Sequence, residues 1–345
     1  MKSSSSLRLG VLLALAGASA CGDVPAPTTA LVPSSPAEAR VATATTDENI
    51  VVSPLLSQIN ASLEAAGADY RVVRGDLRIA ADGWEAVTST VLIADDRYRG
   101  IGAEWVKGDP RRGGRGGVTY AFGSNTAIAP TTRDPNGANV RLVPAADQSA
   151  AVDEGMQAWA GIGCSAQPIT RVAIPAGTDP DLLDQLVRGQ APSQNYARPA
   201  DIVHSGWQPA SWFRTLAGGT SGNNILGVTL LFAFTNAQGA YTDIDRNGKA
   251  DLRFTELFYN ARFYWGNGAP NVVDTYSIIA HESGHAVGVG HFGRVFVTKS
   301  DAADGISISD VKYAPYALMN AVYVTGRSAF TGTDLSSFCS IWSSF

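Results

Sequence analysis

Residues 276–293 read YSIIAHESGHAVGVGHFG and contain three of the four histidines in the chain, at positions 281, 285 and 291. His281 and His285 are four residues apart. On an α-helix this spacing offsets two side chains by only about 40°, so both imidazoles point from the same face. The spacing therefore predicts a helix that presents two nitrogen ligands to one metal ion.

His291 can reach the same ion only if this helix is interrupted. Ten residues of regular helix turn a side chain by about 280° beyond whole turns, which would direct His291 away from His281. Gly288 and Gly290 lie before His291, and glycine takes the left-handed conformation that ends helices at little steric cost. We therefore expect the helix to end near Gly288 and the chain to bring His291 back.

The three imidazoles and one carboxylate form a recognisable chemical set. Three neutral imidazoles leave the fourth position of a tetrahedral Zn²⁺ ion open for water, which is typical of catalytic zinc sites. Glu282 follows the first ligand and can act as general base without binding the metal. Because the pattern H-E-x-x-H-x-x-G-x-x-H is complete, it predicts one catalytic zinc on His281, His285 and His291, with Glu282 as the catalytic residue.

This pattern resembles that of the metzincin clan of zinc endopeptidases, and most closely that of the matrixins. The resemblance covers residues 118–345 and implies an α+β, zincin-like domain: a twisted mixed sheet, an active-site helix and a C-terminal helix. Met319, within the sequence ALMN, is similar to the family's methionine turn, which implies a thioether packed beneath the histidines. The other segments that carry the resemblance are VTYAF, a helix with Met156 and Trp159, ADIVHSGW, LGVTLLFAF, FYNARFYW and TGTDLSSFCSIWSSF.

The resemblance implies a function and also has departures. It implies cleavage of protein or peptide substrates that lie extended against an edge strand at Leu226–Phe234. Ala321 stands where relatives supply a tyrosine, and Tyr323 is the candidate substitute. Matrixin latency uses a pro-segment cysteine, whereas residues 22–117 contain none, so an inhibitory N-terminal unit would act in another way. The alternative function is a catalytically weak module that binds peptide or matrix, which the intact Glu282 disfavours.

Residues 243–251 read DIDRNGKAD and resemble the first part of an EF-hand calcium loop. Position 12 of such a loop is Phe254, so the usual bidentate glutamate is missing, and Glu256 is the candidate substitute. The stretch predicts a Ca²⁺ site, with an acidic turn that binds no metal as the alternative. The expected ligands, at positions 1, 3, 5 and 9, are Asp243, Asp245, Asn247 and Asp251.

The first 20 residues have the form of a secretory signal peptide. Lys2 and Arg8 precede the short apolar run Leu9–Ala20, which is too short to span a bilayer about 30 Å thick. The small residues before Cys21 resemble a bacterial lipobox, which implies lipidation of Cys21; ordinary signal cleavage at the same point is the alternative. We expect an exported protein that is either a cell-envelope lipoprotein or secreted.

The mature chain divides into further segments. Residues 21–48 are rich in Pro, Ser and Thr, which predicts a flexible tether. Residues 49–110 read as a small α/β unit, a candidate pro-domain, and residues 118–345 as the catalytic domain. Between them, residues 108–117 place three arginines among glycines, which we interpret as a flexible basic joint or as an exposed site for activating cleavage.

The sequence also contains two further cysteines, a fourth histidine and an excess of acidic residues. Cys164 and Cys339 would meet oxidising conditions, which favours a disulfide between them; two buried free thiols are the alternative. His204 stands alone and is expected to be packed or exposed instead of a ligand. A net charge of −5 excludes an overall electrostatic footprint for nucleic acid or an anionic membrane. We expect a monomer whose membrane contact is the lipid anchor.

Overall fold

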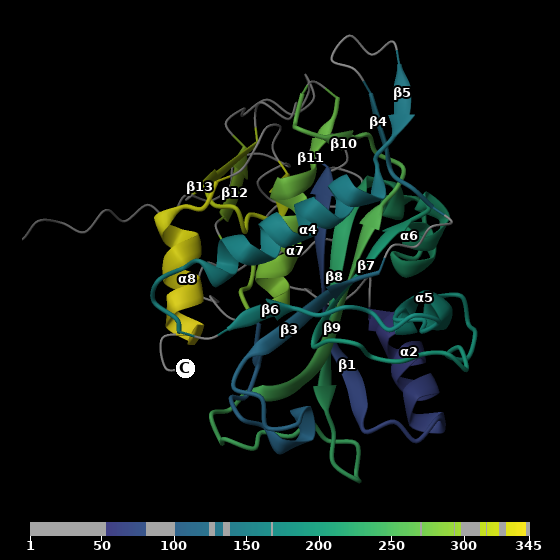
Figure 1. Cartoon of the computed structure of the whole chain (residues 1–345), viewed down its shortest axis with the longest axis vertical. Helices are drawn as coiled ribbons and strands as arrows, with labels where there is room; N and C mark the ends of the chain where they lie inside the picture. The colour runs from purple at the N-terminus through teal and green to yellow at the C-terminus, as the bar shows by residue number, and fades with distance from the viewer. Residues whose placement is uncertain are drawn as a thin grey trace, which may run out of the picture.

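The computed structural model has one main mixed sheet with helices on both faces (Figure 1). The signal peptide expected at residues 1–20, the tether expected at 21–48 and Cys21 lie outside the described residues. No helix in the described part of the chain has the length and apolar character needed to cross a membrane. The structure describes residues 53–80, 101–123, 128–133, 139–166, 168–269, 271–292, 294–297, 311–314, 316–323 and 329–342.

The main sheet contains both parallel and antiparallel pairs. Its strands are β1 (Tyr70–Ala80), β2 (Ala103–Glu104), β3 (Val118–Phe122), β6 (Ile169–Arg171), β7 (Ile202–Gln208), β8 (Ile225–Phe234), β9 (Ala250–Asn260) and β14 (Val322–Tyr323). The order is β14-β1-β8-β9-β7-β3-β6, and β2 pairs with β9. β8 is antiparallel to both of its neighbours, whereas the pairs from β9 to β6 are parallel. The α+β class expected from the sequence is confirmed.

Helices cover both faces of this sheet (Figure 1). One apolar core holds α4 (Ala145–Ala160), α7 (Thr275–Ala286) and α8 (Gly332–Trp342). A second core holds α2 (Ser53–Ala65), α5 (Leu182–Val187) and α6 (Ala210–Leu216). Each side of the sheet therefore has its own hydrophobic core.

Shorter elements lie outside the main sheet. The two-stranded ladders are β4 (Thr131–Arg133) with β5 (Val140–Leu142), β10 (Trp265–Gly266) with β11 (Val273–Asp274), and β12 (Arg294–Val297) with β13 (Val311–Ala314). The 3₁₀ helices are η2 (Pro110–Arg112) and η3 (Thr220–Asn224).

Close packing between α4 and α7 fixes the position of α7. A Cβ atom added at Gly155 of α4 would lie 2.7 Å from Ile279 Cγ2 and 3.1 Å from the backbone nitrogen of Ala280, so glycine allows the two helices to approach. Trp159 is fully buried, and its indole N–H donates to the Ala280 carbonyl at 2.7 Å. The apolar stripe of α4 is thus core, as its spacing predicts.

The segment before residue 108 is built into the same sheet and cores as the segment after 118. β1 lies between β14 and β8, and Ile59 of α2 and Val72 of β1 belong to the core that also holds Phe232. The indole N–H of Trp105 donates to the Ala286 carbonyl at the end of α7, at 2.8 Å. The expected division into an N-terminal unit at 49–110 and a domain at 118–345 therefore does not separate two folded bodies in the described residues.

The segment at 108–117 is held in place by its arginines. Arg112 is only 2% exposed and pairs with Asp201 at 3.1 Å. Arg111 pairs with Asp109 at 2.6 Å and with Asp251 at 2.7 Å. These buried carboxylates anchor the turn, so the interpretation as a flexible basic joint is wrong; the arginines satisfy carboxylates that would otherwise be buried unpaired.

A disulfide joins Cys164, just after α4, to Cys339 in α8. The two Cα atoms are 5.7 Å apart, and the residues are 175 positions apart in the chain. In the chain-entropy model, closing so long a loop stabilises the folded state by up to about 5 kcal/mol. The bond attaches the C-terminal helix to the helix that packs on α7.

Candidate metal centre

The helix that carries two of the histidines has defined ends. Asp274 caps its start, because its carboxylate accepts from the backbone N–H of Ser277 at 2.7 Å. The helix ends at Ala286, and Gly288 takes a left-handed φ of 96° as expected. Indole N–H groups bind its last carbonyls, since Trp342 donates to Val287 at 2.7 Å in the same way that Trp105 donates to Ala286.

The structure brings the three histidines of the motif together. The Nε2 atoms of His281 and His285 are 3.1 Å apart, and the Nε2 atom of His291 lies 3.2 Å and 3.1 Å from them. All three side chains are buried. Ligand nitrogens about 2.0–2.1 Å from a tetrahedral zinc ion would be about 3.3 Å apart, so the spacing suits one small metal ion at their centre.

The second ring nitrogens decide which tautomer two of these imidazoles adopt. Nδ1 of His281 lies 2.8 Å from the Leu318 carbonyl oxygen, and Nδ1 of His285 lies 2.8 Å from the Val289 carbonyl oxygen. A carbonyl can only accept, so each Nδ1 carries the proton and each neutral ring turns an Nε2 lone pair inward. The Nε2 atoms of these two rings, 3.1 Å apart, then direct their lone pairs toward one point. A cation between them satisfies both, so the donor set fits a metal.

Glu282 lies beside this group and is fixed by a strand of the sheet. Its side chain is fully buried, and the Thr229 hydroxyl on β8 lies 2.7 Å from Oε2. A Cβ atom added at Gly227, also on β8, would lie 2.8 Å from Oε1. Glycine at 227 therefore leaves the space that the carboxylate occupies. No local pattern indicates this role of Thr229, because its partner is 53 positions away in the chain.

Met319 packs under the helix between the two helical histidines. A Cβ atom added at Gly284 would lie 2.5 Å from Met319 Sδ, so the thioether contacts the backbone of α7 directly. The turn that contains Met319 is held by Asp334 of α8, whose carboxylate accepts from the backbone N–H groups of Leu318 and Met319 at 3.0 Å each. No local sequence pattern indicates this role of Asp334, because its partners are 16 and 15 positions away.

The structure places the hydroxyl of Tyr323, the candidate substitute for the tyrosine of relatives, at the start of α7. The hydroxyl accepts from the backbone N–H of Asp274 at 2.9 Å, and the side chain is 4% exposed. His204 is fully buried, and its Nδ1 lies 2.7 Å from the Tyr259 hydroxyl. Burial lowers the pKa of His204 to about 3, so it is a neutral packed residue.

The acidic stretch brings its expected ligand residues close together, since Asn247 bonds with Asp243 and Asp245. Asp243, Asp245 and Asp251 offer oxygens within 4.8 Å of one another, the first two exposed and the third buried. Asp243 accepts from the backbone N–H groups of Asn247 and Gly248, at 2.9 and 2.8 Å. Asp251 accepts from Arg111 at 2.7 Å. A cation here would compete with bonds that already exist.

Glu256 is not part of that loop, so its expected role as a substitute ligand is wrong. It is fully buried in β9 and accepts from the backbone N–H groups of Leu182 and Leu183, at 2.9 Å each. Burial raises its pKa well above the usual value, with Asp181 adding to the effect. The carboxylate that does reach the loop is Glu104 of β2, which binds Lys249 and Asn247.

β8 is not an edge strand. It pairs with β9 over Gly227–Ala233 and with β1 over Ile225–Phe234, antiparallel in both cases. The expectation that Leu226–Phe234 offers a free edge is therefore wrong for the chain as it stands, because the N-terminal segment occupies that edge.

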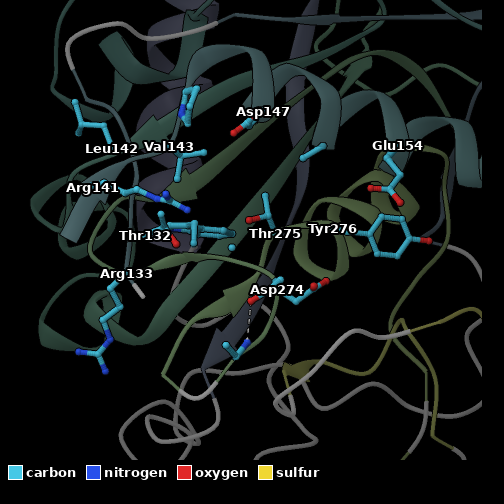
Figure 2. Close-up of a pocket in the computed structure, with 16 residues that line it drawn as sticks. Thr132, Arg133, Arg141, Leu142, Val143, Asp147, Glu154, Asp274, Thr275 and Tyr276 are labelled. Carbon is cyan, nitrogen blue, oxygen red and sulfur yellow. Dashed lines mark hydrogen bonds between the residues drawn. The ribbon is translucent and has the colours of Figure 1, made fainter. Parts of the chain in front are cut away.

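A surface cavity of about 650 Å³ lies away from the histidines. Figure 2 shows side chains reaching it from β4, β5 and the first turns of α4 and α7, among them Thr132, Arg141, Asp147 and Tyr276. No histidine lines it, and neither does Glu282. Its size is within the range of small-molecule sites, and the start of α7 contributes Thr275 and Tyr276 to its lining.

Comparison with known proteins adds no family to this description. No family model matches the sequence, and no curated protein matches it significantly. Function must therefore be argued from the site.

Proposed function

We propose that the chain is an exported, zinc-dependent endopeptidase with a zincin-like catalytic domain. One observation carries the proposal: backbone carbonyls hold the Nδ1 protons of His281 and His285, so Nε2 lone pairs converge 3.1 Å apart next to a buried carboxylate. Three imidazoles suit zinc among the common biological metals. A mixed sheet with α7 and α8 on one face supports the fold part of the proposal.

The residues around the centre have separable roles. Zn²⁺, when held by the three histidines, would supply Lewis-acid polarisation of a scissile carbonyl and lower the pKa of water. The Glu282 carboxylate would take a proton from the attacking water and later deliver it to the leaving amine. The Thr229 hydroxyl, 2.7 Å from Oε2, would hold that carboxylate in place. Met319 and Asp334 would support the helix and the turn that position the ligands.

The test combines metal analysis with hydrolysis. The purified full chain should hold one zinc per chain and cleave a mixed peptide library, and a chelator should abolish cleavage. Glu282→Gln should keep the zinc and lose hydrolysis, because glutamine cannot accept the proton. Full activity of Glu282→Gln would refute the general-base role, and a zinc-free parent would refute the metal centre.

A second function is favoured by the pairing of β8. Because β1 covers the edge of β8, the chain could bind peptide or matrix and turn over little, as a surface module on the same scaffold. Zinc binding without any cleavage of the library would favour this module over the peptidase.

Location and calcium are secondary parts of the proposal. Lipidation at Cys21 would attach the protein to a bacterial envelope, and mass spectrometry of the mature N-terminus would distinguish a lipidated cysteine from plain signal cleavage. We propose that Asp243 and Asp245 bind Ca²⁺ only weakly, since Asp251 already pairs with Arg111.

A further inference from the structure

The surface cavity lies against the small ladder of β4 and β5, outside the main sheet. In this antiparallel ladder Thr132 of β4 is directly opposite Arg141 of β5. Figure 2 shows both residues at the cavity, together with Val143 just after β5. The first turns of α4 and α7 supply further lining, including Asp147 and Thr275. The cavity is therefore bounded by a strand ladder and by the starts of two helices.

The outer edge of β5 presents main-chain groups. The N–H of Val143 donates to the Pro130 carbonyl at 2.9 Å, which makes these two residues a hydrogen-bonded pair of the ladder. Bonded and non-bonded pairs alternate along an antiparallel ladder. Arg141 therefore bonds toward β4, whereas Val140 and Leu142 direct their N–H and C=O groups away from it. No further strand of the described residues pairs with β5, so this edge is open to a strand from another chain.

The side chains of β5 are exposed although two of the three are apolar. Val140 is 55% exposed and Leu142 is 63% exposed. Because side chains alternate along a strand, these two lie on the face of the ladder away from Arg141. Proteins usually protect an apolar edge strand, since it recruits other strands. The edge of β5 therefore favours an extended polypeptide over a small molecule as the ligand.

The cavity contains two charges that are not paired with each other. Among the described residues, neither the Arg141 side chain nor the Asp147 side chain has a hydrogen bond or ion pair. The other arginine of the lining, Arg133, lies over the Tyr264 ring at 4.8 Å. Arg141 comes from β5 and Asp147 from the first turn of α4. A ligand that carries one acidic and one basic group matches this arrangement.

We propose that β5 and its cavity form a second polypeptide-binding site, separate from the metal centre. The site takes an extended segment of another protein as an added strand on the outer edge of β5. Main-chain hydrogen bonds join this segment to Val140 and Leu142. An acidic and a basic side chain of the segment face Arg141 and Asp147, and the apolar residue between them packs against Leu142.

In the proposed endopeptidase this site would hold a protein substrate away from the bond that is cleaved. No metal ligand lines the cavity, and neither does Glu282. The role in substrate capture rests on the proposed function, whereas the binding itself does not.

The main test measures peptide binding by fluorescence anisotropy, using the full chain with Glu282→Gln so that no peptide is cleaved. The labelled peptides are Thr-Val-Glu-Leu-Lys-Val-Thr and Thr-Val-Lys-Leu-Glu-Val-Thr, because an open edge accepts a strand in either direction. The control peptide has serine at both charged positions. One charged peptide should bind at least about tenfold more tightly than the control, as expected for hydrogen bonds between charged groups. Equal affinities would overturn the proposal.

A charge reversal tests the role of Arg141. Arg141→Glu should weaken binding of the better peptide at least about tenfold and improve binding of its variant with lysine in place of glutamate. Lys107→Glu is the matched control, since it reverses another exposed cation outside the cavity and should leave binding unchanged. Unchanged binding by Arg141→Glu would overturn the assignment of Arg141.

A proline tests whether the ligand is an added strand. Leu142→Pro removes an outward N–H and keeps the bonds of β5 to β4, because proline is tolerated on edge strands. It should abolish binding of both charged peptides. Leu142→Ala keeps the N–H and should weaken binding only a few-fold. Peptide binding by Leu142→Pro as tight as that of the parent would refute strand addition.

Hydrolysis kinetics separate this inference from the proposed function. In the zinc-loaded parent, a long quenched substrate that contains the better peptide should have a lower KM than one that contains the serine control. Arg141→Glu should remove that difference and leave kcat unchanged. Binding without hydrolysis by any form would keep the site and refute the peptidase. Hydrolysis with neither peptide binding nor a difference in KM would keep the peptidase and refute the site.

Discussion

The three histidines and the acidic loop are both groups of metal-ligating side chains, but their atoms are satisfied in different ways. At the histidines, backbone carbonyls accept from Nδ1 of His281 and His285, so two Nε2 lone pairs point inward and lie 3.1 Å apart. In the loop, the carboxylates of Asp243 and Asp251 already accept from backbone N–H groups and from Arg111. The first group could therefore hold a cation on its converging nitrogens, whereas the carboxylates of the second already have N–H and guanidinium partners.

A sequence pattern of metal ligands does not predict which other groups bind those ligands. The spacing of the ligands was predictable from the sequence for both groups, whereas their competing partners were not. A group of ligands binds metal strongly when hydrogen bonds to its other atoms fix the side chains so that their lone pairs point to one position. Arg111 reaches Asp251 from 140 positions away, which no local pattern reveals.

The strongest test of this contrast removes one histidine. His285→Ala should reduce bound zinc from one per chain to almost none and lower hydrolysis by about a thousandfold or more, because two imidazoles hold the ion weakly. Elemental analysis and peptide hydrolysis measure both effects. His204→Ala is the control, since it removes a buried histidine outside the group and should leave the zinc content unchanged. A zinc-loaded His285→Ala protein would contradict the assignment.

A smaller effect on activity is expected from displacing the general base. Gly227→Ala would place a methyl group 2.8 Å from Glu282 Oε1, and the carboxylate must move. Misplacement by about 1 Å can cost about a hundredfold in rate, so kcat should fall by about 10- to 100-fold with zinc retained. Gly116→Ala is the matched control, because nothing lies within 4 Å of its added Cβ. Unchanged kcat in Gly227→Ala would contradict the placement of Glu282.

Substitutions in the acidic loop should change the stability of the protein and not its activity. Asp251→Asn breaks a pair with Arg111 in which the carboxylate side chain is 1% and the arginine side chain 28% exposed. We expect a loss of about 2 kcal/mol in the free energy of unfolding, measured with urea, because Arg111 loses one of its two charged partners while the other, Asp109, remains. Asp245→Asn, at an exposed position, should change stability by less than about 0.5 kcal/mol. Loss of zinc from Asp251→Asn would break the contrast between the two groups.

The smallest expected effect is that of calcium. With a Kd of about 1 mM, Ca²⁺ at about 1 mM would stabilise the fold by only about 0.4 kcal/mol. A calorimetric scan of the metal-loaded protein should therefore show a rise in Tm of no more than a few degrees, absent in Asp243→Asn. A Kd for Ca²⁺ in the low micromolar range would show that the ion displaces Arg111 from Asp251.

Local features were predictable where helix geometry or a single residue decides them. The spacing of His281 and His285 predicts their shared face, and the break at Gly288 follows from its backbone freedom. The stripe on α4 is predictable for the same reason. The segment FYNARFYW is strand only in its first part, since β9 ends at Asn260. The Asn260 side chain binds the backbone of Arg262 and Ile225 and turns the chain there.

Features that join distant segments were not predictable. The sequence suggested that residues 49–110 fold apart from 118–345, because glycines and arginines interrupt the chain at 108–117. In the structure the arginines of that segment bind buried carboxylates, and β1 pairs with strands more than a hundred positions away. Strand pairing depends on burial of both faces, which local composition does not encode.

The sequence by itself determined the ligand types, their order and their common helix, because a 3.6-residue period and one left-handed glycine are local properties. Only the tertiary structure decided which nitrogens face inward, where Glu282 rests and what covers β8. Those outcomes depend on contacts between distant segments: Leu318 with His281, Thr229 with Glu282, and β1 with β8. These contacts form only when the sheet and both cores are assembled.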